Sequence, residues 1–232
     1  MLRKILVIDD EKTARDNFEM LLSREFQVFT AGSVSEGIEL AETTKPDAVL
    51  TDLQMPKGSG IDFCKKARQI ESLKNTPIIV VSGIDDVLQR TDCFLYGADD
   101  FIAKPFAGSE LMARISAKLK FLNFDNANSG YQQPLVCGNL TMDDQRFEVM
   151  VNAEKIPFTN QEFVLLAFLI KNANKVVSRE MILESLWSGC TVSSRTVDTH
   201  VCLIREKLVN FDHEIQAIRS RGYILLKRKS NN

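Results

Sequence analysis

The sequence predicts an α/β protein, with a doubly wound, five-stranded parallel sheet in its first half and a smaller second domain. Short apolar runs alternate there with amphipathic stretches of helical length, which is typical of parallel strands joined by helices. A polar, turn-rich stretch at 123–134 has no periodicity and indicates a linker. With 232 residues, the chain is long enough for about two domains with separate cores.

The strands and helices of the first domain are expected within residues 1–122. The strands are expected at 5–8, 26–29, 48–50, 78–81 and 101–103, and the helices at 11–24, 35–42, 61–70, 85–96 and 109–122. In an open parallel sheet, sites form beyond the carboxyl ends of the strands, where the strand order reverses. For the order 2-1-3-4-5, this place lies between the first and third strands.

Polar side chains follow four of these five strands. Asp9 and Asp10 follow the first strand, Asp52 the third, Ser82 the fourth and Lys104 the fifth. Three neighbouring carboxylates repel one another unless a cation neutralises them, and Mg²⁺ binds oxygen ligands while keeping waters that phosphate can replace. A carboxylate that attacks phosphorus needs placement and charge neutralisation more than it needs a base. The pattern therefore predicts an acidic cleft for a metal ion and a phosphoryl group.

Three of these residues also have simpler interpretations. Asp10 is suited to capping the helix that begins near Lys12, Ser82 to a turn, and Lys104 to a solvated surface position. Their positions at successive strand ends favour the cleft.

Residues 1–122 resemble the receiver domain of bacterial two-component response regulators. The motifs that carry this resemblance are Asp-Asp-Glu at 9–11, Asp-Leu-Gln-Met-Pro at 52–56, Val-Val-Ser at 80–82 and Lys-Pro-Phe at 104–106. The resemblance implies a flavodoxin-like fold in which Asp52 is the phosphoacceptor. It implies Mg²⁺ ligands at Asp10, Asp52 and the backbone oxygen of Gln54, with Asp9 acting through water. Ser82 and Lys104 would hold the phosphoryl oxygens, and Lys104–Pro105 would be a cis peptide.

The same resemblance implies a switch at Ser82 and Phe101. Ser82 would move toward the phosphoryl group and Phe101 would turn inward behind it. Most relatives have tyrosine at this position, whereas this chain has phenylalanine, so no phenolic hydroxyl takes part in the switch. The alternative for Phe101 is a purely structural role in the core.

Relatives of the OmpR/PhoB type pair through the fourth helix, fifth strand and fifth helix. Two of their charge pairs are matched by Arg90 with Glu110 and by Asp100 with Arg114. A third pair is missing because Leu95 and Ser116 replace charged residues. Since exposed ion pairs contribute only about 0–1 kcal/mol each, a homodimer on activation is expected from these pairs but not assured by them.

The second domain is expected at 135–232. It begins with short strands around 135–137, 140–142, 146–151 and 155–158, which suggest an antiparallel sheet, and three helices are expected at 163–171, from Ser178 to Trp187, and at 194–209. Thr159 to Glu162 is a capping box for the first of these helices. In the third helix, Val197, Val201, Ile204 and Leu208 recur at helical spacing and are expected in the core. The opposite side would present Arg195, Thr199, His200, Cys202, Leu203 and Glu206.

Three segments resemble the winged helix-turn-helix effector of the OmpR/PhoB subfamily: 195–201, 205–208 and 219–223. The resemblance implies that the third helix enters the major groove and that a following hairpin contacts the DNA backbone or minor groove. The implied DNA-contacting residues are Arg195, Thr196, Thr199, His200, Leu203, Arg205, Arg219 and Arg221. Five basic residues and no acidic one lie between Arg219 and Lys229, although a basic terminus is often only solvated.

The third helix departs from its relatives at Cys202 and Leu203, where basic residues are common, and it adds Glu206 to or near the same face. These changes weaken attraction to phosphate and remove a bidentate contact to guanine. We therefore expect weaker or differently directed DNA binding.

Together these observations predict a transcription factor that a sensor histidine kinase switches by phosphorylating Asp52. Promoter DNA and RNA polymerase are the other expected partners, Mg²⁺ the expected cofactor and the cytoplasm the expected location. No signal peptide or membrane segment is expected, and the five cysteines, spaced singly, suggest neither disulfides nor zinc.

One alternative is an effector that acts mainly through protein contacts. Another is an aspartyl-phosphate phosphatase, but those enzymes place an acid where this chain has Gln54. Beyond its own phosphotransfer and slow autodephosphorylation, no enzyme activity is expected.

Overall fold

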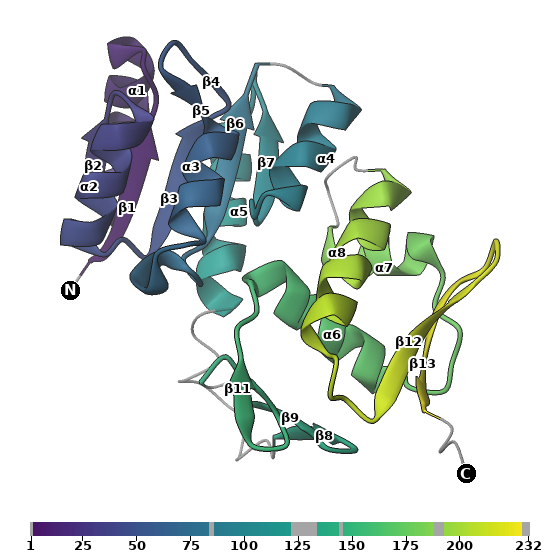
Figure 1. Cartoon of the computed structure of the whole chain (residues 1–232). Helices are drawn as coiled ribbons and strands as arrows, with labels where there is room; N and C mark the ends of the chain where they lie inside the picture. The colour runs from purple at the N-terminus through teal and green to yellow at the C-terminus, as the bar shows by residue number, and fades with distance from the viewer. Residues whose placement is uncertain (1, 84–85, 122–133, 144–145, 188–192, 229–232) are drawn as a thin grey trace. The chain divides into compact units, whose positions relative to one another are not determined.

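The computed structural model describes residues 2–83, 86–121, 134–143, 146–187 and 193–228. The chain divides into two compact units, Met1–Asn123 and Phe124–Asn232 (Figure 1). Residues 123–133 of the expected linker lie outside the described residues. None of the described helices is long and apolar enough to cross a membrane.

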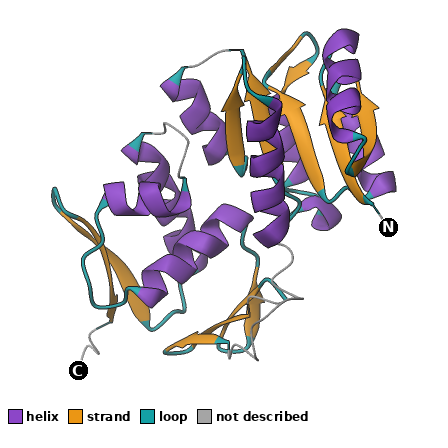
Figure 2. Cartoon of the chain, turned by 180° about the vertical axis from the view of Figure 1, so that it is seen from behind, coloured by secondary structure: helices purple, strands orange, loops and turns teal. Residues whose placement is uncertain are grey.

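The first unit contains a five-stranded parallel sheet (Figures 1 and 2). Its strands, in spatial order, are β2 (Phe26–Ala31), β1 (Arg3–Ile8), β3 (Ala48–Asp52), β6 (Ile78–Ser82) and β7 (Asp100–Ala103). This confirms the expected order 2-1-3-4-5. A two-stranded hairpin of β4 (Gln54–Met55) and β5 (Gly58–Ser59) follows β3 and was not expected.

Helices cover both faces of this sheet. They are α1 (Lys12–Leu22), α2 (Val34–Thr44), α3 (Gly60–Ala67), α4 (Val87–Leu95) and α5 (Gly108–Phe121), with a short 3₁₀ helix at Glu71–Leu73. Ile5 and Val7 of β1 join a buried cluster with Leu22 of α1 and Leu111 of α5. Because neighbouring strand residues point to opposite faces, Ile8 points the other way, and it lies close to Gly37 of α2.

Arg68, after α3, closes the amino-terminal edge of the sheet. Its guanidinium donates six hydrogen bonds of 2.6–3.1 Å, to the backbone oxygens of Leu73, Lys74, Thr76 and Gly97 and to the carboxylate of Asp99. Asp99 also accepts a hydrogen bond from the backbone N–H of Ile78 at 2.7 Å. Burial raises the pKa of Asp99, and the charge of Arg68 opposes this shift. The cluster joins the ends of α3 and α4 to the starts of β6 and β7.

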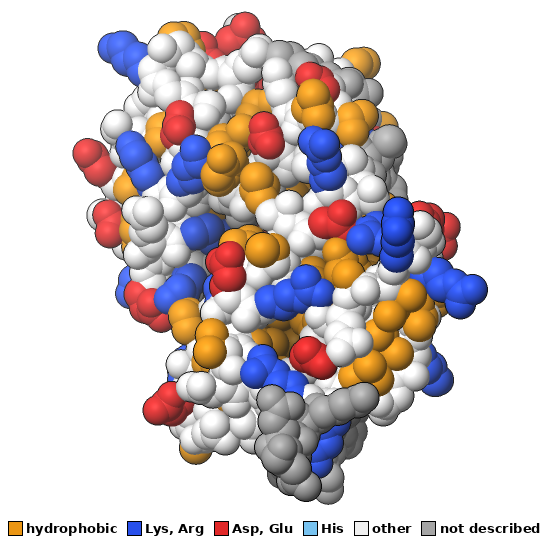
Figure 3. Space-filling view, turned by 45° about the vertical axis from the view of Figure 1, so that its right-hand side comes forward, with side chains coloured by type: hydrophobic (Ala, Val, Ile, Leu, Met, Phe, Trp, Pro, Cys, Tyr) orange, Lys and Arg blue, Asp and Glu red, His pale blue; other side chains and the backbone are white. Residues whose placement is uncertain are grey.

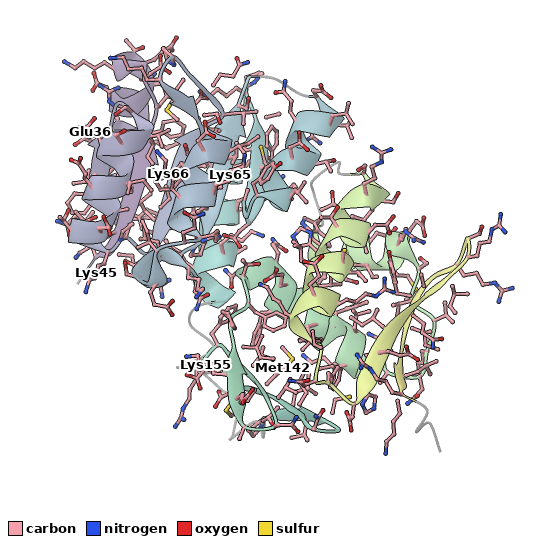
Figure 4. All side chains as sticks on the ribbon, in the orientation of Figure 1. Glu36, Lys45, Lys65, Lys66, Met142 and Lys155 are labelled. Carbon is pink, nitrogen blue, oxygen red and sulfur yellow. The ribbon has the colours of Figure 1, made fainter. Side chains whose placement is uncertain are left out.

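The second unit begins with a four-stranded antiparallel sheet of β8 (Leu135–Cys137), β9 (Leu140–Asp143), β10 (Glu148–Val151) and β11 (Glu154–Ile156). Alternate residues of β9 and β10 are buried, among them Met142, so one face of the sheet packs on the core. Lys155 of β11 instead pairs with Glu148 of β10 at 2.8 Å; Figure 4 labels both Met142 and Lys155.

Three helices and a hairpin complete this unit. They are α6 (Asn160–Lys171), α7 (Arg179–Leu186), α8 (Ser194–Lys207), β12 (His213–Ile218) and β13 (Gly222–Lys227). The expected capping box is present, because Thr159 and Glu162 bond each other's backbone N–H groups. The residues of the third expected helix that were expected in the core are all buried: Val197, Val201 and Ile204 lie in α8, and Leu208 directly follows it.

The first prediction concerns Gly222, at the start of β13. Its φ is +123°, and an added Cβ would lie 2.0 Å from the backbone oxygen of Val177, which bonds to Tyr223. We expect Gly222→Ala to lower the free energy of unfolding of the second unit by about 2–3 kcal/mol, because both strain and a lost strand contact contribute. Urea unfolding followed by the fluorescence of Trp187, the chain's single tryptophan, measures this unit.

Gly83→Ala is the matched control, since a Cβ there would meet no atom within 4 Å. An unchanged urea midpoint for Gly222→Ala would contradict the prediction.

Candidate functional site

Three strand ends of the first unit meet around one lysine. Asp9 follows β1, Asp52 ends β3 and Lys104 follows β7. The Nζ atom of Lys104 lies 3.2 Å from Oδ2 of Asp9 and 3.0 Å from Oδ1 of Asp52. These contacts join residues far apart in the sequence, and they bring together the acidic side chains and the lysine of the predicted cleft.

Burial and neighbouring charge shift the pKa values of Asp52 and Lys104 in opposite directions. Burial raises the pKa of Asp52, and the hydrogen bond and positive charge of Lys104 offset part of that rise. Burial alone would lower the pKa of Lys104, but the attraction of Asp52 and Asp9 outweighs it and leaves the pKa above its ordinary value. Lys104 is therefore held as a cation beside two carboxylates.

Backbone contacts fix the positions of these groups. The N–H of Lys104 donates to the backbone oxygen of Ser82 at 2.7 Å, and Lys104–Pro105 is a cis peptide, as expected. A Cβ on Gly60 would lie 2.5 Å from the backbone oxygen of Asp52, so the start of α3 approaches the end of β3 closely. Oδ2 of Asp52 accepts a hydrogen bond from the N–H of Gln54 at 2.9 Å.

The carboxylates open onto a cleft of about 750 Å³. Its lining includes Asp9, Asp10, Glu11, Asp52, Gln54 and Lys104. Asp9 is buried and accepts the N–H of Glu11 at 2.9 Å, whereas Asp10 is exposed. All the ligands expected for the metal line this one space.

The expected switch residues are buried behind the cleft. Ser82 and Phe101 are 1% and 3% exposed. The guanidinium carbon of Arg90, from α4, lies 5.0 Å from the centre of the Phe101 ring, and Arg90 is itself only 6% exposed.

The other expected dimer residues form ion pairs within the chain. Arg114 of α5 lies 3.2 Å from Asp100 and 3.0 Å from Glu110. Lys118 adds a further contact to Asp100 at 3.6 Å.

Four of the expected DNA-contacting residues of α8 are exposed or half-buried, and the other two are buried. Arg195 and Arg205 are exposed, and Thr199 and Leu203 are half-buried. Cys202 and Glu206 are exposed as expected, with Cys202 Sγ 3.7 Å from a Glu206 oxygen. Arg219 and Arg221 are exposed at the tip of the β12–β13 hairpin.

The prediction that Thr196 and His200 contact DNA is wrong. They are 1% and 2% exposed, and Nδ1 of His200 lies 2.8 Å from the backbone oxygen of Thr196. The His200 ring packs edge-on against Trp187, with centres 5.5 Å apart. Both residues lie on the side of α8 that carries Val197, so the buried arc of this helix is wider than its apolar residues indicate.

The comparisons with known proteins match both units. Residues 5–116 match the family model described as response regulator receiver domain, and residues 153–225 match the one described as transcriptional regulatory protein, C terminal. The response regulator ArlR of Staphylococcus aureus (strain Mu50) is 32% identical over 228 residues, covering 97% of this chain and all of ArlR. The chain belongs to the OmpR/PhoB-type response regulators.

Solved structures agree with this assignment. The response regulator DrrB of Thermotoga maritima, an OmpR/PhoB homologue, is 29% identical with a TM-score of 0.50, and a mutant of RitR is 25% identical with a TM-score of 0.71. Each match covers 97% of this chain and all of the other. The predicted fold class, with a flavodoxin-like receiver and a winged helix-turn-helix effector, is confirmed, and the chain is a two-component transcription factor.

This response regulator also contains an effector cluster to which the sequence analysis gave no role. Oδ1 of Asp198, in α8, accepts hydrogen bonds from Arg179 of α7 at 2.6 Å and from the hydroxyl of Tyr223 of β13 at 2.5 Å. Burial, and then the bond to Asp198, raises the pKa of Tyr223. Arg205 donates to the backbone oxygen of Ile215 at 2.9 Å. These contacts fix α8 relative to α7 and the hairpin. Asp198 and Tyr223 lie in the resembling motifs, which was the available signal.

The second prediction tests the correction at His200. We expect His200→Ala to lower the free energy of unfolding of the effector by about 1–3 kcal/mol, because it removes a buried ring and a hydrogen bond. Urea unfolding followed by Trp187 fluorescence measures this loss, and DNA affinity is then compared at conditions where both proteins are folded.

Cys202→Ala, exposed on the same helix, is the control and is expected to leave stability unchanged. Unchanged stability of His200→Ala combined with lost DNA affinity would restore the original interpretation.

Proposed function

We propose that Asp52 is the residue that a sensor histidine kinase phosphorylates. The observation that carries this proposal is the position of the Lys104 ammonium, 3.0 Å from Asp52 and 3.2 Å from Asp9. A carboxylate oxygen of Asp52 attacks the phosphorus of a phosphohistidine, the P–N bond breaks and an acyl phosphate forms. Lys104 offsets negative charge on the transferred group, and Ser82 lies at the end of the neighbouring strand to bind its oxygens.

The ligand set of the cleft fits Mg²⁺, which receiver domains generally bind. Asp9, Asp10, Asp52 and the backbone oxygen of Gln54 offer only oxygen donors and line one open space. When bound, Mg²⁺ would neutralise charge on the phosphoryl group. Among the described residues, no three Asp, Glu, His or Cys side chains already converge as a metal site. In this structure, the ammonium of Lys104 contacts both Asp9 and Asp52.

The proposed output is pairing of receivers and binding of promoter DNA, with RNA polymerase as a further partner and the cytoplasm as the place of action. Two surfaces would carry it. The receiver surface comprises Arg90, Asp100, Glu110 and Arg114, and the DNA-contacting surface comprises Arg195, Thr199, Leu203, Arg205, Arg219 and Arg221. On the face drawn in Figure 3, Lys and Arg side chains are interspersed with Asp and Glu.

One observation favours a second candidate, an effector that acts mainly through protein contacts. Cys202 and Glu206 are both exposed on α8, so part of its outer face lacks positive charge. The salt dependence of DNA binding separates the two candidates, because phosphate contacts give a steep dependence.

We propose no turnover of a separate substrate. Gln54 stands two residues after Asp52, where an aspartyl-phosphate phosphatase has an acid, and its backbone N–H bonds to Asp52. The chemistry of the cleft is then limited to phosphotransfer to Asp52 and slow autodephosphorylation.

The third prediction tests the phosphoacceptor. Incubation with acetyl phosphate and Mg²⁺ is expected to add one phosphoryl group to the wild-type chain and none to Asp52→Asn, as read by intact-protein mass spectrometry. Asp16→Asn changes an exposed carboxylate of α1 outside the cleft and is expected to behave as wild type. Phosphorylation of Asp52→Asn to the wild-type level would disprove the assignment.

The fourth prediction concerns Leu203. We expect Leu203→Arg to tighten binding to a duplex selected by the wild-type chain about 3- to 10-fold, and to steepen the logarithmic salt dependence by about 1, because it adds a phosphate or base contact. Footprinting titrations at several salt concentrations measure both quantities.

Val209→Arg adds the same charge at a residue that is exposed beyond the end of α8, and it controls for non-specific attraction. Equal effects of the two substitutions, or no effect of Leu203→Arg, would count against a role for this position in DNA contact.

A further inference from the structure

Arg15, near the start of α1, binds the main chain of the loop that enters the phosphoryl cleft. One nitrogen of its guanidinium, Nη1, donates to the backbone oxygen of Asp9 at 2.6 Å and to that of Asp10 at 3.0 Å. Asp9 and Asp10 both line the cleft. The arginine therefore ties the start of α1 to the two acidic residues that follow β1.

The surroundings of the guanidinium hold it in this position. Gly32 directly follows β2, and an added Cβ there would lie 3.3 Å from Nη1 of Arg15. The φ of Gly32 is not left-handed, so the space taken by the guanidinium, rather than the backbone conformation, favours glycine here. The N–H of Gly32 donates to a carboxylate oxygen of Glu36 in α2 at 2.7 Å, and Figure 4 labels Glu36. Arg15 thus lies against a second loop that is itself fixed to a helix.

The two residues that Arg15 binds differ in their other restraints. The N–H of Asp9 donates to the backbone oxygen of Ala31 at 3.1 Å, and its Oδ1 accepts the N–H of Glu11 at 2.9 Å. Asp9 is buried, whereas Asp10 is exposed. Loss of the arginine would therefore free Asp10 more than Asp9.

The acceptors of Arg15 matter for a cation site. The ammonium of Lys104 contacts the carboxylates of Asp9 and Asp52 directly. Arg15 bonds to carbonyl oxygens instead, so it holds the loop without occupying carboxylate oxygens. In metal sites, groups that orient the ligands without touching the metal typically change its affinity by about 10- to 100-fold.

We propose that Arg15 is a positioning residue that sets the Mg²⁺ affinity of the cleft by holding the backbone of Asp9 and Asp10. This inference rests on the proposed function and adds a residue to its metal-binding step. Simple electrostatics has the opposite effect: a positive charge near a cation site repels the cation, so its removal alone would tighten Mg²⁺ binding. Loss of positioning weakens binding, and the sign of the change therefore separates the two effects.

The first test is a titration of the ¹⁵N-labelled full-length chain with MgCl₂, followed by the amide resonances of Asp10 and Lys104. Arg15→Gln is expected to raise the Mg²⁺ dissociation constant about tenfold. Because one nitrogen makes both bonds, the ammonium introduced by Arg15→Lys can replace them, and this variant is expected to stay within about threefold of wild type. Only resonances of the folded chain are followed, so a loss of stability alone does not move the constant.

Lys12→Gln is the matched control, because it removes an exposed positive charge from the first residue of the same helix. It is expected not to raise the constant. An unchanged or lower constant for Arg15→Gln would overturn the proposal.

The second test follows hydrogen exchange in the metal-free chain. The N–H of Glu11, which bonds to Asp9, is expected to exchange about tenfold faster in Arg15→Gln and at the wild-type rate in Lys12→Gln. An unchanged rate in Arg15→Gln would refute the positioning role. Failure of the proposed function gives a different result, since the wild-type chain itself would then bind no Mg²⁺ and accept no phosphoryl group from acetyl phosphate. If the wild-type chain does both and Arg15→Gln keeps its Mg²⁺ constant, this inference alone fails.

Discussion

The ammonium of Lys104 between the carboxylates of Asp9 and Asp52 is the interaction on which the receiver depends. Two carboxylates with little exposure to solvent repel each other, and the ammonium between them offsets this repulsion. The three groups come from three different strands, so no local segment can create the site. Only the parallel sheet, with β1 beside β3 and β7 two strands away, brings their ends to one edge. The same lysine is held by its backbone to Ser82, which links the charge balance of the cleft to the position of the next strand.

Much of the receiver could be predicted from the sequence because its signals are local. Short apolar runs defined the strands, and polar residues at four of the five strand ends defined the cleft. The β4–β5 hairpin was missed because strands of two residues have no periodicity to detect. The Arg68 cluster was missed for another reason: its acceptors lie up to 31 residues away, and four of the five are backbone oxygens that any residue provides.

The effector was less predictable where several elements pack on one helix. The apolar spacing of α8 gave the centre of its buried face correctly, at Val197 and Val201. It could not give the width of that face, which depends on how many neighbours surround the helix. Thr196 and His200 fall inside the arc covered by the rest of the unit, so polar character was a poor guide to their exposure. Arg90 gives the same lesson in the receiver, since a charged side chain lies inward against an aromatic ring. In each case, the polar or charged residue type predicted an exposed side chain, but the tertiary packing buries it.

Arg68 constrains one end of the receiver sheet more than the other. Six hydrogen bonds from one side chain hold the segments that lead into β6 and β7, so that end of the sheet is strongly constrained. Ser82 and Lys104 lie at the other ends of these two strands, away from Arg68. A group added in the cleft would therefore displace the ends of β6 and β7 that carry Ser82 and Lys104 more than the ends that Arg68 holds.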